Sequence, residues 1–133
     1  RRVTRPGGAL LVLAEPDYGG RVDYPAELAE LGRLQAASLR SQGAEPELGR
    51  RLVGLFSSLG LESVETGVLG AQWSGPLSAK ELESEWAVLD SDLQGWVSPE
   101  QFELLRQLDE KSWQRGERVL FVPTFYALGR LPG

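Results

Sequence analysis

The sequence predicts an α/β fold of about three strands and about four helices, in a single domain that spans residues 1–133. One observation is a set of short, almost wholly apolar runs, such as Ala9 to Ala14, of the kind found in buried strands. The other is a set of longer segments in which apolar residues recur every three or four positions, between a capping residue and a glycine. A length of 133 residues with 41% hydrophobic side chains suits one small globular domain.

The first part of the chain predicts one strand and two helices. The strand covers Ala9–Ala14, and its apolar character predicts that both of its faces are covered. A helix follows from Pro25 to Gly43, since proline suits the first turn of a helix. The next helix begins near Pro46 and stops at Gly60. Its apolar residues at helical spacing are Leu48, Leu52, Leu55, Phe56 and Leu59.

The second part predicts a strand from Glu62, two helices and a final strand. Ser78-Ala79-Lys80-Glu81 has the spacing of a capping box, and Ser98 followed by Pro99 starts the next helix in a similar way. The residues expected to face inward are Leu82, Trp86, Leu89 and Leu93 in the first helix and Phe102, Leu105, Leu108 and Trp113 in the second. The last strand runs from Arg118 to Arg130, and we expect a bulge or kink at Pro123.

The composition excludes several kinds of site. The chain has no cysteine, which rules out disulfides, thiolate catalysis and cysteine-based zinc sites. It has no histidine, which removes the commonest metal ligand and the usual general base near neutral pH. A net charge of −5, with arginines spread along the chain, argues against a nucleic-acid partner. We find no membrane span and no signal peptide, and so expect a cytoplasmic protein without a membrane partner.

Three segments, taken in their order along the chain, resemble one known family. RPGGALLVLAEPDYGG, residues 5–20, joins a Pro-Gly-Gly turn to a strand and an acidic, glycine-rich loop. Gly60 and Leu61 form a turn into the next strand, and an apolar strand runs from Arg118 to Arg130. These segments resemble the second half of class I S-adenosylmethionine-dependent methyltransferases. The resemblance implies a partial Rossmann-like sheet in which the last strand is antiparallel and central between the other two.

The resemblance also implies a function and a cofactor. We expect the chain to be the C-terminal, substrate-side portion of a methyltransferase that is inactive as an isolated fragment. S-adenosylmethionine and a small-molecule methyl acceptor are then expected to bind the parent protein. The family's glycine-rich cofactor loop has no counterpart in this chain, which offers no cofactor-binding or metal-binding residues and no identifiable catalytic residue.

Candidate substrate-binding residues lie in the loop over residues 15–24. The loop leaves the carboxyl end of the first strand, the edge at which open α/β sheets bind ligands. The candidates are Glu15, Asp17, Tyr18, Arg21 and Tyr24. A purely structural alternative is that Asp23 caps the following helix, Asp17 and the glycines form turns, and Arg21 pairs with a nearby carboxylate.

A stand-alone binding or oligomerisation module is the alternative function. Residues 90–101 nearly follow an EF-hand calcium loop, with Asp90 and Asp92 among the ligand positions. Gln101 stands where a bidentate glutamate is needed, so we expect no calcium in this loop. Trp73 and Trp96 lie beside glycines or in likely loops and are candidates for a pocket or an interface.

The first strand has a consequence for self-association. In the complete family fold another strand would pair with its outer edge, and this sequence contains no such strand. Residues 9–14 would then present an open, apolar edge, which is a template for pairing with another chain. We therefore expect the isolated fragment to form a homodimer.

Overall fold

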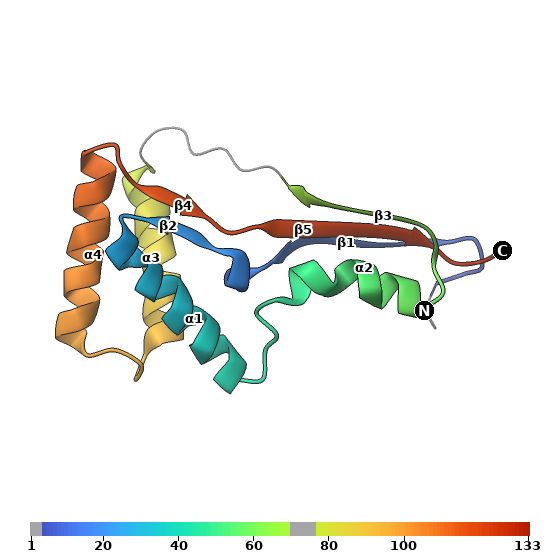
Figure 1. Ribbon diagram of the computed structural model, residues 1–133, viewed down its shortest axis with the longest axis horizontal. Coiled ribbons are helices and arrows are strands. Elements are labelled where there is room, and N and C mark those ends of the chain that lie inside the picture. The colour runs from blue at the N-terminus through green and yellow to red at the C-terminus, as the bar shows by residue number, and fades with distance from the viewer. Residues whose placement is uncertain (1–3, 70–76) are drawn as a thin grey trace. The chain divides into compact units, whose positions relative to one another are not determined.

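The computed structural model describes residues 4–69 and 77–133, which form a mixed α/β structure with four α-helices and five β-strands (Figure 1). The strands are β1 (Ala9–Pro16), β2 (Val22–Tyr24), β3 (Glu62–Leu69), β4 (Val119–Phe121) and β5 (Thr124–Arg130). The helices are α1 (Ala29–Ser41), α2 (Leu48–Ser58), α3 (Ala79–Leu93) and α4 (Pro99–Gln114). Two short 3-10 turns cover Tyr18–Gly20 and Ala26–Leu28. The mixed α/β class and the four helices are as predicted.

The chain divides into two compact units. Unit 1 comprises residues 1–20, 46–71 and 122–133, and unit 2 comprises residues 21–45 and 72–121. Each unit has its own cluster of buried apolar side chains. The single domain expected over residues 1–133 stays a prediction.

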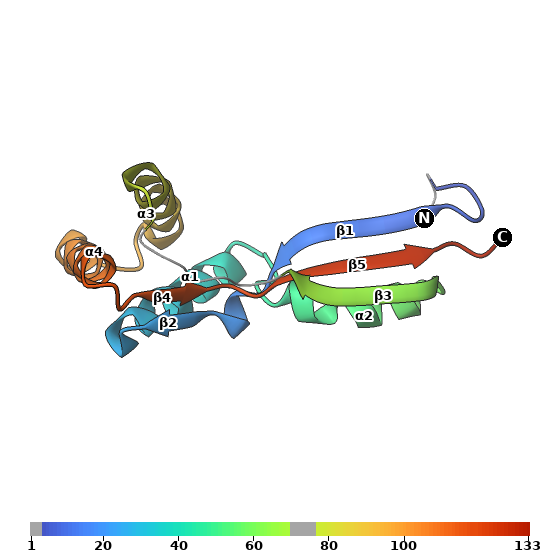
Figure 2. The same cartoon turned by 90° about the horizontal axis from the view of Figure 1, so that it is seen from above.

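Unit 1 is built on a three-stranded sheet in the order β1-β5-β3 (Figure 2). Both outer strands are antiparallel to β5, which therefore lies at the centre. In this register Leu11 of β1 lies opposite Leu128 of β5, and Gly67 of β3 lies opposite Tyr126. The missing Cβ of Gly67 makes room for the Tyr126 ring, which would lie 2.6 Å from an added Cβ.

Each outer strand carries a bulge against β5. In β1 the register shifts between Val12 and Glu15, and Ala14 adopts a φ of 58°. In β3 the register shifts between Glu62 and Glu65, and Ser63 adopts a φ of 50°. A bulge bends its strand and increases the local twist, so both edges of this sheet curve relative to β5.

Helix α2 covers one face of the unit 1 sheet (Figure 1). The buried core between them consists of Leu52, Phe56, Leu61, Ala127 and Leu131. The close approach of α2 depends on Gly49, because a Cβ there would lie 2.7 Å from the Phe125 ring and 2.9 Å from the carbonyl oxygen of Glu15.

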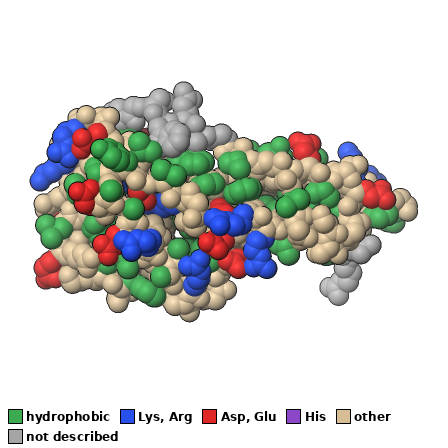
Figure 3. Space-filling model, in the orientation of Figure 1, with side chains coloured by type: hydrophobic (Ala, Val, Ile, Leu, Met, Phe, Trp, Pro, Cys, Tyr) green, Lys and Arg blue, Asp and Glu red, His purple; other side chains and the backbone are tan. Residues whose placement is uncertain are grey.

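The face opposite α2 retains exposed apolar side chains. Hydrophobic side chains are also visible along the side of unit 1 that Figure 3 shows, where the sheet is seen nearly edge-on. Leu11 and Leu13 of β1 are 52% and 63% exposed. The prediction that both faces of the first strand are covered is therefore wrong for the described residues. Alternate side chains along a strand point to opposite faces, and only Leu10 and Val12 reach the α2 side.

Unit 2 combines a two-stranded antiparallel ribbon, β2-β4, with α1, α3 and α4. Its buried apolar core is formed by Leu28, Leu31, Trp86, Leu89, Leu93 and Leu105. The Trp86 and Phe102 rings meet edge to face, with centroids 5.2 Å apart. The inward positions predicted for α3 and α4 are confirmed, because three of the four in α3 and Leu105 in α4 are buried and the rest are half-buried.

Helix boundaries follow the capping signals closely in unit 2. The predicted capping box is confirmed, since the Ser78 side chain accepts from the backbone of Glu81 and the Glu81 side chain accepts from the backbone of Ser78. Ser98 caps α4 and Pro99 occupies its first turn. The helix predicted from Pro25 begins later than expected, because a 3-10 turn at Ala26–Leu28 precedes α1.

The final strand is divided. The single strand predicted over residues 118–130 is wrong, because β4 belongs to unit 2 and β5 to unit 1. The break lies at Val122 and Pro123, where a kink was expected. Proline has no N–H for a sheet ladder. The Pro123 carbonyl instead accepts a hydrogen bond of 2.8 Å from the Asp17 backbone N–H.

Candidate functional site

The loop that follows β1 in unit 1 is organised around Asp17, which is only 1% exposed. Its carboxylate accepts hydrogen bonds from Arg50 Nε at 2.5 Å and Arg50 Nη2 at 2.7 Å. The backbone N–H of Gly20 donates to the same carboxylate at 3.0 Å. The Arg50 guanidinium hydrogen-bonds to the charged carboxylate and holds the Asp17 pKa below its usual range, against the opposing effect of burial.

Backbone hydrogen bonds fix the same loop to two other segments of unit 1. Asp17 N–H donates to the Pro123 carbonyl just before β5, and Tyr18 N–H donates to the Pro46 carbonyl just before α2, both at 2.8 Å. Arg50 lies in the first turns of α2, from which it reaches back to the loop. The loop, the start of α2 and the start of β5 are thus held together by hydrogen bonds.

Glu15 and Tyr18 lie on either side of Asp17 in the sequence, Glu15 within β1 and Tyr18 at the start of the 3-10 turn. Glu15 is half-buried near the end of β1, opposite Phe125 of β5. Tyr18 begins the 3-10 turn and is also half-buried. Unit 1 therefore brings three of the five candidate substrate-binding residues together, and of these Asp17 is turned inward onto Arg50.

Arg21 and Tyr24 belong to unit 2, whereas the other three candidates belong to unit 1. The Arg21 side chain is buried and donates to the Asp23 carboxylate at 2.7 and 3.2 Å and to Gln35 Oε1 at 2.9 Å. The structural alternative for Arg21, a pair with a nearby carboxylate, is confirmed. Tyr24 keeps an exposed ring, while its backbone carbonyl accepts from Arg118 at 3.2 Å.

Asp23 belongs to a buried ionic network and does not cap a helix. It lies in β2 and accepts from Arg21 and, at 2.7 Å, from Arg118 Nη2. Arg118 Nε donates in turn to Asp109 at 2.5 Å, and Trp86 Nε1 donates to the other oxygen of Asp109 at 2.9 Å. The proposed capping role of Asp23 is therefore wrong, because its carboxylate is used by two guanidinium groups.

This network joins most elements of unit 2. Through Arg21 it continues to Gln35 of α1, whose side-chain amide donates to the Asp92 carboxylate of α3 at 2.8 Å. The charged side chains at its centre are 5% exposed or less. Buried charges are tolerated when they are paired and hydrogen-bonded, so the network serves to position β2, β4 and the helices and presents no open group to a substrate.

Sequence reasoning missed Asp109 and Arg118, although one signal was present. Asp109 lies four residues after Leu105 and three before Ser112, and all three are buried on the inner side of α4. An acidic residue on an apolar helix stripe indicates a buried carboxylate that requires a cation. The cation, Arg118, follows in the next element, but sequence spacing alone does not identify it among the other arginines.

Residues 90–101 adopt a helix-turn-helix geometry in place of a calcium loop. α3 continues through Leu93, so Asp90 and Asp92 are helical, and Asp92 already accepts from Gln35. Within residues 4–69 and 77–133 no group of three or more acidic side chains is arranged to hold a metal ion. Trp96 is exposed in the turn between α3 and α4, and Trp73 lies outside the described residues.

Comparisons with known proteins give no family for the chain. No protein-family model matches the sequence, and no curated protein matches it. In the part of the chain that the structure describes, none of the helices has the length and apolar character needed to cross a membrane.

Proposed function

We propose that this chain is the C-terminal, substrate-side part of a class I S-adenosylmethionine-dependent methyltransferase. The observation that carries the proposal is the strand order β1-β5-β3, with β5 antiparallel to both neighbours. The resemblance in sequence implies this order for the last three strands of the family's Rossmann-like sheet. In this order β1, from the first part of the sequence, pairs with β5, from its last part.

The turns at the family-like segments also support the proposal. In the Pro-Gly-Gly turn before β1, Gly7 has a φ of 70° and Gly8 N–H donates to the Arg5 carbonyl at 2.9 Å. A Cβ on Gly8 would lie 2.8 Å from that carbonyl oxygen, so both positions favour glycine. Gly60, with a φ of 64°, ends α2 and is followed by the buried Leu61.

The described residues do not fit S-adenosylmethionine. When bound to a methyltransferase, this cofactor supplies the methyl group that the acceptor's nucleophilic atom displaces. A phosphate- or cofactor-binding turn of the Rossmann type needs a glycine-rich loop between a strand and the helix that follows it. This sequence contains no G-x-G-x-x-G spacing at any position, so it supplies no such loop. We therefore derive no catalytic step through the cofactor from this chain.

The chain's own contribution in this proposal is to position the acceptor side of the protein. Asp17 holds the loop after β1 in one conformation, because both of its carboxylate oxygens are occupied by Arg50 and Gly20. Glu15 and Tyr18 stay the candidates in unit 1 for contacts to a small-molecule methyl acceptor. A cytoplasmic location is part of the same proposal.

A stand-alone binding or oligomerisation module is the second candidate function. The observation that favours it is the exposed apolar face of the unit 1 sheet, with Leu11 and Leu13 on β1 and Leu69 on β3. Apolar patches of this kind mark interaction surfaces more often than isolated exposed residues do. In the methyltransferase proposal, a strand of the missing half would instead pair with the outer edge of β1.

Titration calorimetry with S-adenosylmethionine tests the proposal. We expect no measurable binding to residues 1–133. We expect binding when the protein also includes the segment that its own gene encodes before Arg1. If that longer protein fails to bind, or if the segment lacks a glycine-rich strand-loop-helix, the second candidate function is favoured. Micromolar binding to residues 1–133 alone would reveal a cofactor site in this chain and contradict its assignment as the substrate-side part.

A further inference from the structure

A cavity of about 390 Å³ opens at the turn between α3 and α4, within unit 2. Its apolar lining includes Leu93, which is buried in the unit 2 core, and the half-buried Val97 and Phe102. Asp90 and Gln94 add a carboxylate and an amide. The cavity therefore combines an apolar floor with polar groups contributed by the last turn of α3 and the turn that follows it.

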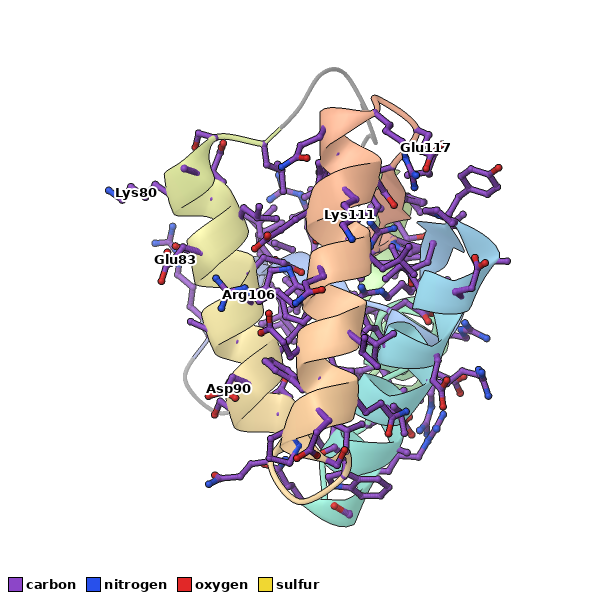
Figure 4. The ribbon with its side chains drawn as sticks, turned by 90° about the vertical axis from the view of Figure 1, so that its left-hand side faces the viewer. Lys80, Glu83, Asp90, Arg106, Lys111 and Glu117 are labelled. Carbon is purple, nitrogen blue, oxygen red and sulfur yellow. The ribbon has the colours of Figure 1, made fainter. Side chains whose placement is uncertain are left out.

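Among the described residues, the one charged side chain that lines this cavity is the carboxylate of Asp90. α3 has no basic residue in its last turn, and the C-terminal end of a helix carries the negative end of its dipole. Asp90 lies at this end of α3, beside the turn to α4 (Figure 4). The neighbouring Asp92 accepts a hydrogen bond from Gln35, whereas Asp90 has no hydrogen-bond or ionic partner within the described residues. A cation at Asp90 would therefore meet a carboxylate with which no other described side chain pairs.

We propose that this cavity binds a small organic ammonium ion, with the charged nitrogen at Asp90 and an apolar or aromatic body against Val97 and Phe102. The negative helix end and the Asp90 carboxylate select against anions. A bare divalent cation would require six or more oxygen ligands for calcium, which the apolar lining does not supply. The Phe102 ring offers an additional attraction for a cation that approaches its face.

The inference is tested with phenethylammonium, followed by ¹H–¹⁵N correlation NMR spectra of the whole chain. We expect saturable chemical-shift changes centred on Gly95, Val97 and Phe102, with a dissociation constant on the order of 1 mM for a ligand of this size. The neutral analogue 2-phenylethanol should bind more weakly, and the anion 3-phenylpropionate should give no saturable change. Equal binding of all three compounds, or no saturable shift with phenethylammonium, would overturn the proposal.

Two matched variants separate the cavity from general surface charge. Asp90→Asn should weaken phenethylammonium binding about two- to fivefold, the size expected of an exposed ion pair. Glu83→Gln removes an equivalent charge from the same helix, away from the cavity, and should leave binding unchanged. Because both side chains are exposed, both variants should fold. An unchanged affinity for Asp90→Asn, or an equal loss in Glu83→Gln, would show that Asp90 does not hold the ammonium group.

Discussion

The guanidinium of Arg50 lies side by side with the carboxylate of Asp17, with Nε 2.5 Å from one oxygen and Nη2 2.7 Å from the other. The two residues are 33 positions apart in the sequence, so this pair joins two segments of unit 1 that are separated along the chain by residues 21–45 of unit 2. The Asp17 side chain is buried, whereas that of Arg50 is 48% exposed. The charge of the buried Asp17 carboxylate is therefore stabilised mainly by Arg50, whereas the exposed Arg50 guanidinium is also solvated by water.

The stability of unit 1 should fall in acid because of Asp17. Its folded-state pKa is lowered, chiefly by the hydrogen bonds from Arg50, below the value of about 3.9 in an unfolded chain. The pair thus stabilises the folded state fully above the unfolded pKa, and this contribution is lost as the pH falls through the folded pKa. Urea unfolding should show wild type more stable than Asp17→Asn at pH 7, with the difference shrinking below about pH 4. Glu62→Gln on β3 controls for the loss of one carboxylate, and a difference for Asp17→Asn that does not depend on pH would refute this account.

Arg118→Met should destabilise unit 2 strongly. The substitution leaves Asp23 and Asp109 buried with one guanidinium fewer, and breaking a buried pair in this way costs about 3–5 kcal/mol. Arg115→Met is the control, since Arg115 is 58% exposed in its pair with Glu117 and its loss should change stability by less than about 1 kcal/mol. Chemical denaturation followed by tryptophan fluorescence measures both, and similar losses in the two variants would mean that the buried network contributes little.

Two glycines of α2 should respond in opposite directions to alanine. At Gly49 an added Cβ would lie 2.7 Å from the Phe125 ring, so Gly49→Ala should lower stability by about 1–3 kcal/mol through overpacking. At Gly54 nothing lies within 4 Å, so Gly54→Ala should raise stability by about 0.5–1 kcal/mol through better helix propensity. Thermal melts of the two variants suffice, and a tolerated Gly49→Ala would show that α2 and β5 can separate without cost.

The isolated chain should self-associate through β1. Leu11 and Leu13 are exposed on this strand, which pairs only with β5 on its inner side in the described structure. Leu13→Lys places a charge on that surface and should shift the chain towards a monomer. Leu104→Lys, at a residue that is 67% exposed on α4, should leave association unchanged. Multi-angle light scattering at tens of micromolar decides the matter, and a wild-type monomer of 14.6 kDa would rule out the homodimer.

Local signals in the sequence predicted most elements of this chain. The Ser78 capping box and the Ser98-Pro99 start are local, because the groups that satisfy the first turn of a helix lie within a few residues of each other. The sequence predicted a bulge or kink at Pro123, but it did not predict that the last strand would be divided into β4 and β5. Whether β4 and β5 belong to one sheet depends on the pairing of β2 with β4, and β2 is too short to show a strand pattern of its own.

The candidate site was harder to predict because it depends on pairs that are distant in sequence. Asp17 and Arg21 are both candidate substrate-binding residues by sequence, but their roles are set by distant or buried partners. Asp17 pairs with Arg50, and Arg21 pairs with Asp23 and Gln35. An acidic residue in a glycine-rich loop has the same local appearance whether it faces a substrate or a buried arginine. Only the fold reveals which of the many possible partners lies within hydrogen-bond distance.

The central position of β5 also sets the order of events during synthesis. β1 and β3 each pair with β5 and not with one another, so neither has a strand partner in this sheet until residues 124–130 have left the ribosome. A nascent chain would carry β1 without its sheet partner while residues 17–123 are synthesised, a period in which chaperones and premature aggregation compete for it. A stop codon placed just before Thr124 would accordingly remove β5 and, with it, both of the strand pairings that form the β1-β5-β3 sheet.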